Sequence, residues 1–422
     1  MFAAKPFEQL MQLPGAVRQY LLITFNYWSF TLTDGALRML VVLHFHDLGY
    51  SPLAIAMLFL FYEIFGVVTN LIGGWLGARL GLNRTMNLGL GMQVFALAML
   101  LVPAANLPLW LAGVPWVMAA QAISGIAKDL NKMSAKSAIK LLVPEGEQGK
   151  LYQWVALLTG SKNALKGAGF FLGGALLALL GFELAIATMA ILFGLVWLLS
   201  LVMLKKDLGK AKNKPKFTEI FSKSRSVNIL SAARLFLFAA RDVWFVVALP
   251  VYLASQLGWD HWAVGGFLAL WVIGYGIVQT LAPKITRNRQ AKSQLIDSAP
   301  DGRSALIWAS MLAFVPALIA SAIQLSFYPE ASLLLGLMLF GALFAVNSSL
   351  HSYLIVSYAS EDAVSLDVGF YYMANAMGRL VGTVLSGLVY QAYGLAACLW
   401  ISTAFIGITA MISIKLPRQV AE

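Results

Sequence analysis

Apolar runs of about 20 residues follow one another along almost the whole chain, and this pattern decides what the chain can fold into. Of its 422 residues, 60% are hydrophobic and 12% are charged, whereas about 25% charged residues are usual in a soluble domain. A soluble fold of this length has no means of burying so much apolar surface. We therefore expect an all-α membrane protein, and the ordinary water-soluble enzyme folds are excluded.

The runs predict twelve transmembrane helices. The one long polar segment, 205–226, separates the sixth run from the seventh. We therefore predict an N-terminal six-helix bundle over 1–204, a basic cytoplasmic linker over 205–226, and a C-terminal six-helix bundle over 227–422. The predicted helices cover 19–44, 52–78, 85–104, 113–140, 151–179, 182–204, 227–254, 261–284, 305–326, 331–358, 364–392 and 395–415.

Basic residues lie on one side of these predicted helices. Of the 30 lysines and arginines, 21 fall in the terminal segments, the linker and alternate loops, and the remaining loops hold none. Because cytoplasmic loops are rich in Lys and Arg, we expect both termini in the cytoplasm and the chain in the inner membrane of a bacterium. A net charge of +11 would favour nucleic-acid binding in a soluble protein. Here the basic residues of the cytoplasmic segments account for the positive net charge, and no nucleic-acid partner is expected.

A pattern of one basic residue and three glycines recurs after 213 positions, which indicates two homologous halves, as in many secondary transporters. The glycines would also allow close packing of helices. The first copy is Lys166, Gly169, Gly174 and Gly181, and the second is Arg379, Gly382, Gly387 and Gly394.

Charges inside the predicted helices indicate the chemistry. A cation that faces lipid at mid-depth costs about 2.5–3.5 kcal/mol, so these cations must face protein or a wet cavity. An unpaired buried cation is costly, and at least five of them have no acid nearby in the sequence, so we predict a multivalent anionic substrate. The alternative is that the cations pair with acids and only hold helices together. The cations are Arg38, Lys128, Lys132, Lys136, Lys162, Lys166, Arg234, Arg241 and Arg379, and the clear acids are Asp34, Glu63, Asp129 and Asp242.

Spacing and predicted depth assign roles to these residues. Lys128, Lys132 and Lys136 lie on one stripe of a helix, and we expect Asp129 to point off that stripe. Lys166 and Arg379 occupy equivalent repeat positions, so we expect them to bind the two ends of one substrate. The predicted substrate-binding residues are Arg38, Lys128, Lys132, Lys166, Arg241, Arg379, Asn347 and His351, and the predicted access path from the cytoplasm holds Lys136, Lys162 and Arg234. The candidates for proton coupling are Asp34, Glu63 and Asp242, each of which could equally be an ion-pair partner.

No cofactor is expected. His44, His46 and Asp47 could bind a metal, but such residues at a helix end are usually solvated. The chain has no Walker A motif, so uphill transport would need an ion gradient, the gradient of the substrate itself, or a separate ATPase subunit. Cys398 is the single cysteine, which excludes an internal disulfide.

The 6+6 plan resembles the Major Facilitator Superfamily. The family's loop motif between the second and third helices is similar to the sequence GWLGARLG at 74–81, in which Gly74, Arg79 and Gly81 would form the gating loop. Ala78 stands where the family usually has an acid, and Leu82-Asn83 stands where it has a basic pair.

Within that superfamily, the chain resembles the organoarsenical efflux permeases of the ArsJ type. The resemblance is strongest in NYWSFTLTDGALRMLVVLHFH, GIAKDLNKMSAKSAIKLLVP and LLTGSKNALKGAGFFLGG. It implies a monomeric, secondary-active exporter of 1-arseno-3-phosphoglycerate that confers arsenate resistance by alternating access. Glyceraldehyde-3-phosphate dehydrogenase would be the functional partner that makes this substrate.

Two other functions stay open at this point. One is export or exchange of another organophosphate or multivalent organic anion. The other is a membrane-embedded enzyme or a protein that binds lipid headgroups. An enzyme would gather acids and histidines in one helix or loop, whereas this sequence scatters them.

Overall fold

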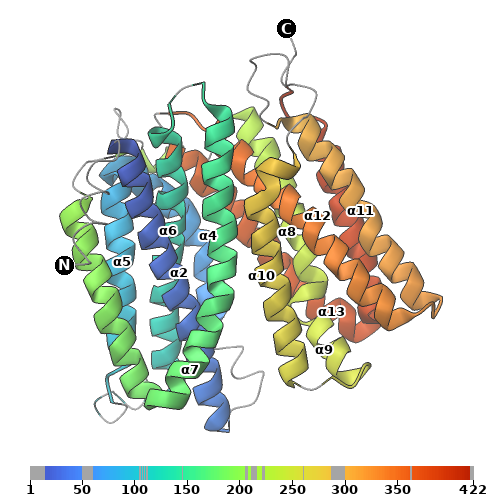
Figure 1. Cartoon of the computed structure of the whole chain (residues 1–422), viewed down its shortest axis with the longest axis horizontal. Coiled ribbons are helices and arrows are strands. Elements are labelled where there is room, and N and C mark those ends of the chain that lie inside the picture. The colour runs from blue at the N-terminus through green and yellow to red at the C-terminus, as the bar shows by residue number, and fades with distance from the viewer. Residues whose placement is uncertain are drawn as a thin grey trace, which may run out of the picture. The chain divides into compact units, whose positions relative to one another are not determined.

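The computed structural model is built from helices (Figure 1). No strand occurs among the residues that it describes, which confirms the expected all-α class. The structure describes residues 15–49, 60–103, 106, 108, 110, 113–144, 146–204, 208–210, 216–220, 224–259, 261–286, 300–361 and 364–418.

The helices follow the apolar runs of the sequence. Three of them, α6, α10 and α12, begin and end within two residues of the predicted positions. The helices are α2 (Gly15–Asp47), α4 (Leu60–Leu80), α5 (Leu82–Met99), α6 (Val114–Leu142), α7 (Gln148–Met203), the short 3₁₀ helix η2 (Phe217–Glu219), α8 (Arg225–Phe245), α9 (Ala248–Ser255), α10 (His261–Ile285), α11 (Gly302–Gln324), α12 (Pro329–Tyr358) and α13 (Val364–Ser413).

Six helical stretches of the described chain are long and apolar enough to cross a membrane. Helix α6 is not among them, and its four mid-helix charges lower its hydropathy. The count of twelve spans therefore stays a prediction. The six stretches are Gln148–Met203, Arg225–Ser255, Ala263–Ile285, Gly302–Gln324, Pro329–Tyr358 and Val364–Ser413.

The two longest helices are each interrupted by a glycine. Gly181 has φ 71° and ψ 179° inside α7, and Gly394 has φ 76° and ψ −176° inside α13. This backbone conformation is essentially restricted to glycine. The two glycines occupy equivalent positions of the sequence repeat, and both lie in gaps between predicted helices. The two copies of the repeat therefore share the same backbone conformation at this glycine.

One predicted helix is interrupted, and another ends earlier than predicted. The helix predicted over 227–254 is divided into α8 and α9. At the division, the Ser386 hydroxyl accepts hydrogen bonds from the backbone N–H groups of Val247 (3.3 Å) and Ala248 (3.1 Å), which satisfies donors at the start of α9. Helix α5 ends at Met99 instead of 104, in a tight turn before Pro103, because the residue before a proline disfavours the helical conformation.

The described chain forms two compact units. Unit 1 comprises 1–151, 168–220 and 360–369, and unit 2 comprises 152–167, 221–359 and 370–422. In unit 1, α6 packs against α2, α4 and α5, and in unit 2, α12 packs against α8, α10 and α11. The division of the sequence into two six-helix bundles stays a prediction.

Each unit has an apolar core of its own. In unit 1, Leu40 and Leu97 pack with Ile186. In unit 2, the fully buried Trp244 ring meets Phe340 edge-to-face at 5.0 Å between centroids. These cores hold the helices that carry the charged side chains.

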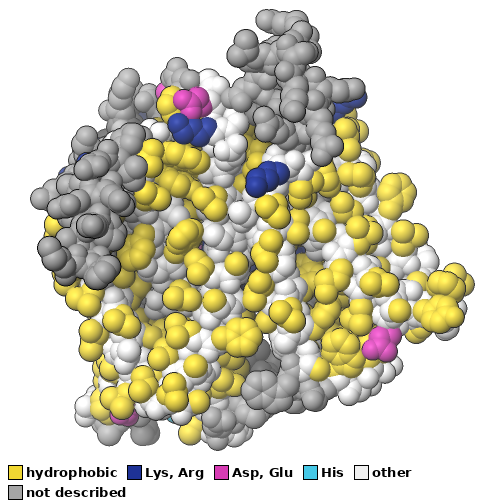
Figure 2. Space-filling view, in the orientation of Figure 1, with side chains coloured by type: hydrophobic (Ala, Val, Ile, Leu, Met, Phe, Trp, Pro, Cys, Tyr) yellow, Lys and Arg dark blue, Asp and Glu magenta, His cyan; other side chains and the backbone are white. Residues whose placement is uncertain are grey.

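Hydrophobic side chains cover much of the face in Figure 2, where the few charged groups lie towards the helix ends. Large apolar residues such as Leu179, Phe314 and Leu335 are strongly exposed. Such a surface suits contact with lipid chains instead of water.

Candidate functional site

Tyr62 organises the charged residues of unit 1. Its hydroxyl donates a 2.7 Å hydrogen bond to the carboxylate of Asp34, which joins α4 to α2. The Lys128 ammonium of α6 lies 3.7 Å from the centroid of the Tyr62 ring, and the Arg38 guanidinium of α2 lies 4.8 Å from it. One aromatic ring thus holds two cations by cation–π attraction while its hydroxyl holds an acid. We call Asp34, Arg38, Tyr62 and Lys128 the tyrosine cluster.

The lysine stripe on α6 is paired in part. Lys132 forms a 2.6 Å ion pair with Asp129, which is 2% exposed. Lys132 therefore has an acid partner even though Asp129 is offset from the stripe, because an i, i+3 pair is close enough on a helix for the lysine to reach across. The second carboxylate oxygen of Asp129 has no hydrogen-bond partner among the described residues. Lys136, one turn further along, is also buried.

Asp242 lies between two arginines in unit 2. It accepts from Arg241 at 2.6 Å (Nε) and 2.5 Å (Nη2), and its other oxygen lies 3.5 Å from Nε of Arg379. The carboxylate is 1% exposed, whereas the Arg241 and Arg379 side chains are 17% and 34% exposed. The buried acid therefore anchors two guanidinium groups that keep accessible surface, which is suited to binding an oxyanion.

Arg234 lies two turns before Arg241 on α8 and is 3% exposed. Its Nε donates to the side-chain oxygen of Asn375 at 2.9 Å, and its Nη1 donates to the backbone carbonyl of Ser348 at 3.3 Å. Its guanidinium also lies 3.9 Å from the centroid of the Phe238 ring. All of these partners are neutral, so they leave the charge of Arg234 uncompensated.

The polar segment of α12 faces the interior of unit 2. His351 is 0% exposed, and neither ring nitrogen has a hydrogen-bond partner among the described residues. Asn347 is equally buried and uses its amide nitrogen to bond the Leu343 carbonyl at 3.0 Å. The Ser349 hydroxyl donates to the backbone carbonyl of Gln279 on α10 at 3.4 Å. This segment thus mixes helix-to-helix hydrogen bonds with buried polar atoms that the described residues do not satisfy.

The two remaining predicted cations lie on the part of α7 that belongs to unit 2. Lys162 and Lys166 are both half-buried there. Between them, Asn163 donates a 2.6 Å hydrogen bond to the side-chain oxygen of Gln279. The pairing of Lys166 with Arg379 on one substrate stays a prediction.

The predicted loop motif, 74–81, is helical in unit 1: residues 74–80 form the last turns of α4, and Gly81 follows the helix. Arg79 lies over the Trp75 ring, 5.0 Å from its centroid. Gly81 has φ 96° and ends the helix, and the next amide, that of Leu82, donates to the carbonyl of Leu208 at 2.7 Å. A Cβ on Gly74 would lie 3.1 Å from Cα of Gly369, so this glycine permits close packing.

A comparison with protein families assigns this arrangement of helices. The sequence profile described as the Major Facilitator Superfamily matches residues 20–299, which is more than half of the chain. The chain belongs to the Major Facilitator Superfamily. No curated protein sequence matches it.

Solved structures of this superfamily share the fold at low sequence identity. A bacterial homologue of the iron transporter ferroportin, in an outward-facing state, matches with a TM-score of 0.75 and 16% identity over 94% of this chain and 98% of its own. The human organic anion transporter MFSD10 (TETRAN) matches with a TM-score of 0.71 and 15% identity, over 95% of this chain and 100% of its own. The proton:xylose symporter XylE, bound to 6-bromo-6-deoxy-D-glucose, matches with a TM-score of 0.71 and 15% identity, over 94% of this chain and 95% of its own.

Some predicted residues of this superfamily member cannot be placed. The side chain of Glu63 lies outside the described residues, and so do those of His46 and Asp47. His44 stacks on the Phe182 ring at 4.0 Å between centroids. Among the described residues, no group of three or more His, Cys, Asp or Glu side chains could hold a metal ion.

Sequence reasoning missed the neutral partners of the cations in this transporter. The chain has 14 tyrosines, and nothing in the sequence distinguishes Tyr62 from the others. Asn375 lies one turn before Arg379 on α13, but this spacing does not indicate its hydrogen bond to Arg234, which lies on α8.

Proposed function

We propose that this chain is a secondary-active permease that carries a multivalent organic anion by alternating access. One observation carries the proposal: two cations, the buried Arg234 of unit 2 and the half-buried Lys128 of unit 1, have neutral partners in the structure. A cation held by carbonyl groups and aromatic rings keeps its attraction for a bound anion.

The arginines beside Asp242 support the same substrate class. A guanidinium presents a planar fork of donors that matches carboxylate, phosphate and arsenate oxygens in a bidentate way. Arg241 and Arg379 are anchored by one buried carboxylate and keep exposed surface. This arrangement favours an oxyanion over a neutral sugar or a metal cation.

The resemblance to the organoarsenical efflux permeases narrows the substrate to 1-arseno-3-phosphoglycerate. That molecule has a phosphate at one end and an arsenate ester at the other, so it is small, polar and multiply charged. A glyceraldehyde-3-phosphate dehydrogenase would supply it in the cytosol, and export would confer arsenate resistance. Arg38, Lys132, Lys166, Asn347 and His351 complete the proposed binding set.

The proposed topology follows from the charge asymmetry of the loops. We place twelve transmembrane helices in the inner membrane of a bacterium, with both termini in the cytoplasm. Lys136, Lys162 and Arg234 would then lie towards the cytoplasmic side, where they would attract the anion from the cytosol towards the middle of the membrane. Gly74, Arg79 and Gly81 would form the gating loop, and Asp34, Glu63 or Asp242 would carry any coupled proton.

Everted vesicles test the substrate directly, because their outer surface is the cytoplasmic face. We would incubate them with arsenate, glyceraldehyde-3-phosphate, the dehydrogenase and NAD, and leave out one component at a time. Arsenic should accumulate only when all four are present. An Arg234→Gln variant, matched in expression, should accumulate little.

Three results would change the proposal. Accumulation with arsenate alone would remove the organoarsenical and leave an arsenate exporter. Labelled 3-phosphoglycerate could instead enter the vesicles without arsenate, as fast as arsenic does from the complete mixture. That result would favour the alternative of an exporter or exchanger of ordinary organophosphates. Full accumulation by Arg234→Gln would remove that residue from the site.

A further inference from the structure

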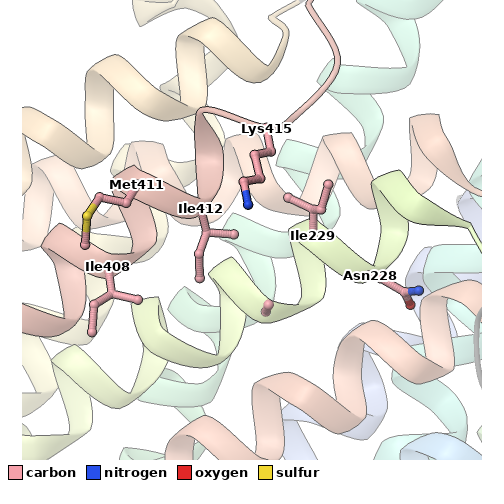
Figure 3. Close-up of a pocket in the computed structure, with 7 residues that line it drawn as sticks. Asn228, Ile229, Ile408, Met411, Ile412 and Lys415 are labelled. Carbon is pink, nitrogen blue, oxygen red and sulfur yellow. The ribbon is translucent and has the colours of Figure 1, made fainter.

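A groove of about 500 Å³ opens on the outer surface of unit 2, between α8 and the end of α13 (Figure 3). It is separate from the arginines around Asp242. Its lining is mainly apolar, with one amide and one amine at the end where α8 begins and α13 finishes. The lining residues are Asn228, Ile229, Ala232, Ile408, Met411, Ile412 and Lys415.

The groove rests on a tight contact between the two helices. The Thr409 hydroxyl of α13 donates to the Ala233 carbonyl of α8 at 3.3 Å, which holds the helices together beneath it. Ala232 is small and leaves the space open, while Met411 at the rim is 61% exposed. A groove with aliphatic walls fits an acyl chain.

Lys415 stands at the mouth of this groove on an anchored segment. Its backbone N–H bonds the Ile412 carbonyl at 3.1 Å, and the Pro417 carbonyl accepts from the Gly302 N–H at 3.0 Å and from the Tyr358 hydroxyl at 3.3 Å. Figure 3 shows the side chain of Lys415 extending between Ile412 and Ile229. A lysine can lay its aliphatic stem on apolar surface and present its ammonium at the edge.

The charge at this mouth is positive and accessible. No ion pair joins Lys415 to a carboxylate of the described residues. Arg225 and Arg418 are also exposed, three residues before Asn228 and three after Lys415. An apolar groove that ends in an amine and an amide is complementary to a molecule with an acyl chain and an anionic headgroup.

We propose that this groove binds one anionic phospholipid, with an acyl chain along Ile408, Met411 and Ile412 and its phosphate on Lys415. Basic pockets between transmembrane helices are known to hold anionic headgroups. The lipid would fill the space between α8 and α13 at this groove. The proposal does not depend on which anion the protein transports.

Native mass spectrometry of the purified, delipidated full chain in detergent tests this. Phosphatidylglycerol and phosphatidylcholine with identical acyl chains would be titrated separately, and soluble glycerol 3-phosphate would serve as a headgroup without a chain. The wild type should retain one phosphatidylglycerol in preference to phosphatidylcholine, and glycerol 3-phosphate should not displace it.

Three variants localise the binding. Lys415→Gln should bind phosphatidylglycerol about fivefold more weakly, the effect of one lysine near an anionic lipid, and should lose the preference for it. Lys415→Arg should keep the preference. Lys284→Gln is the matched control, because Lys284 is an exposed lysine at the end of α10 that does not line the groove. Ala232→Phe fills the groove and should reduce binding of both lipids.

Equal loss in Lys415→Gln and Lys284→Gln would overturn the proposal, since binding would then be non-specific. Displacement by glycerol 3-phosphate would show a site for a polar solute instead. A dimer in the wild type that Ala232→Phe abolishes would assign the groove to a second copy of the chain. Each variant should elute as wild type from size exclusion, which separates loss of binding from misfolding.

Discussion

The Tyr62 hydroxyl donates a 2.7 Å hydrogen bond to the Asp34 carboxylate, and both groups are buried. A hydrogen bond to a charged group contributes about 1.5–3 kcal/mol. Tyr62→Phe removes this bond and keeps the ring beneath Lys128, whereas Tyr62→Leu removes both. We expect transport by Tyr62→Phe to fall about tenfold, and Tyr62→Leu to be lower still.

Initial rates of uptake into everted vesicles would measure this, with Tyr393→Phe as the control. Tyr393 is 78% exposed, so its hydroxyl should not matter. Equal rates in Tyr62→Phe and the wild type would show that the hydrogen bond only joins two helices.

Neighbouring lysines of α6 should differ in what they support. Lys132→Gln leaves the buried Asp129 without its ion pair, and breaking such a pair costs about 3–5 kcal/mol. We therefore expect a lower melting temperature in detergent, which Asp129→Asn should restore in the double variant. Lys128→Gln loses only a contact with a ring, so it should melt nearly as the wild type does and yet fail to transport. Unchanged transport in the Lys128, Lys132, Lys136 triple glutamine variant would remove the stripe from the mechanism.

The ion pairs of Asp242 allow substrate binding to be separated from structure. If Arg379 binds the anion, Arg379→Lys should keep part of the activity, and Arg379→Gln should have none, even when Asp242→Asn returns the local net charge to its wild-type value. If Arg379 serves only as a partner of Asp242, the double variant should recover full efflux. Efflux and melting temperature measured on the same four proteins distinguish the two roles.

Gly181 and Gly394 should be equally intolerant of a side chain. Each has positive φ with extended ψ, a conformation that costs a residue with a Cβ about 1–3 kcal/mol. Gly181→Ala and Gly394→Ala should therefore each lower the melting temperature. Gly194→Ala is the control, because Gly194 is helical and its Cβ would meet nothing within 4 Å. A control that destabilises as much as the other two would refute the explanation.

A substitution of the buried His351 tests whether this residue serves transport or only packing. Replacing a buried polar side chain that has no partner by an apolar one of similar size is often neutral or stabilising. His351→Leu should therefore keep or raise the melting temperature while transport falls more than about tenfold. Retained transport would assign His351 to packing alone.

The all-α class and the positions of most helices could be predicted from the sequence, because the bilayer requires long apolar runs and each run forms its own hydrogen bonds. The repeat of Lys166 and Arg379 with their glycines was also visible, since equal spacing in sequence needs no tertiary information. Its last glycines, Gly181 and Gly394, fall in the gaps between predicted helices, where the structure interrupts α7 and α13.

The charges themselves were determined by the sequence, but their partners were decided by the tertiary structure. Helical spacing relates only residues of one helix. For that reason Arg241 and Asp242 could be paired on paper, while Tyr62 with Asp34, Arg234 with Asn375, and Arg379 with Asp242 could not. Each of those contacts joins two helices, and which faces meet depends on how the helices pack. The sequence thus determined that cations lie within the membrane helices, and packing decided which of them keep a carboxylate and which, like Arg234, are left with neutral partners.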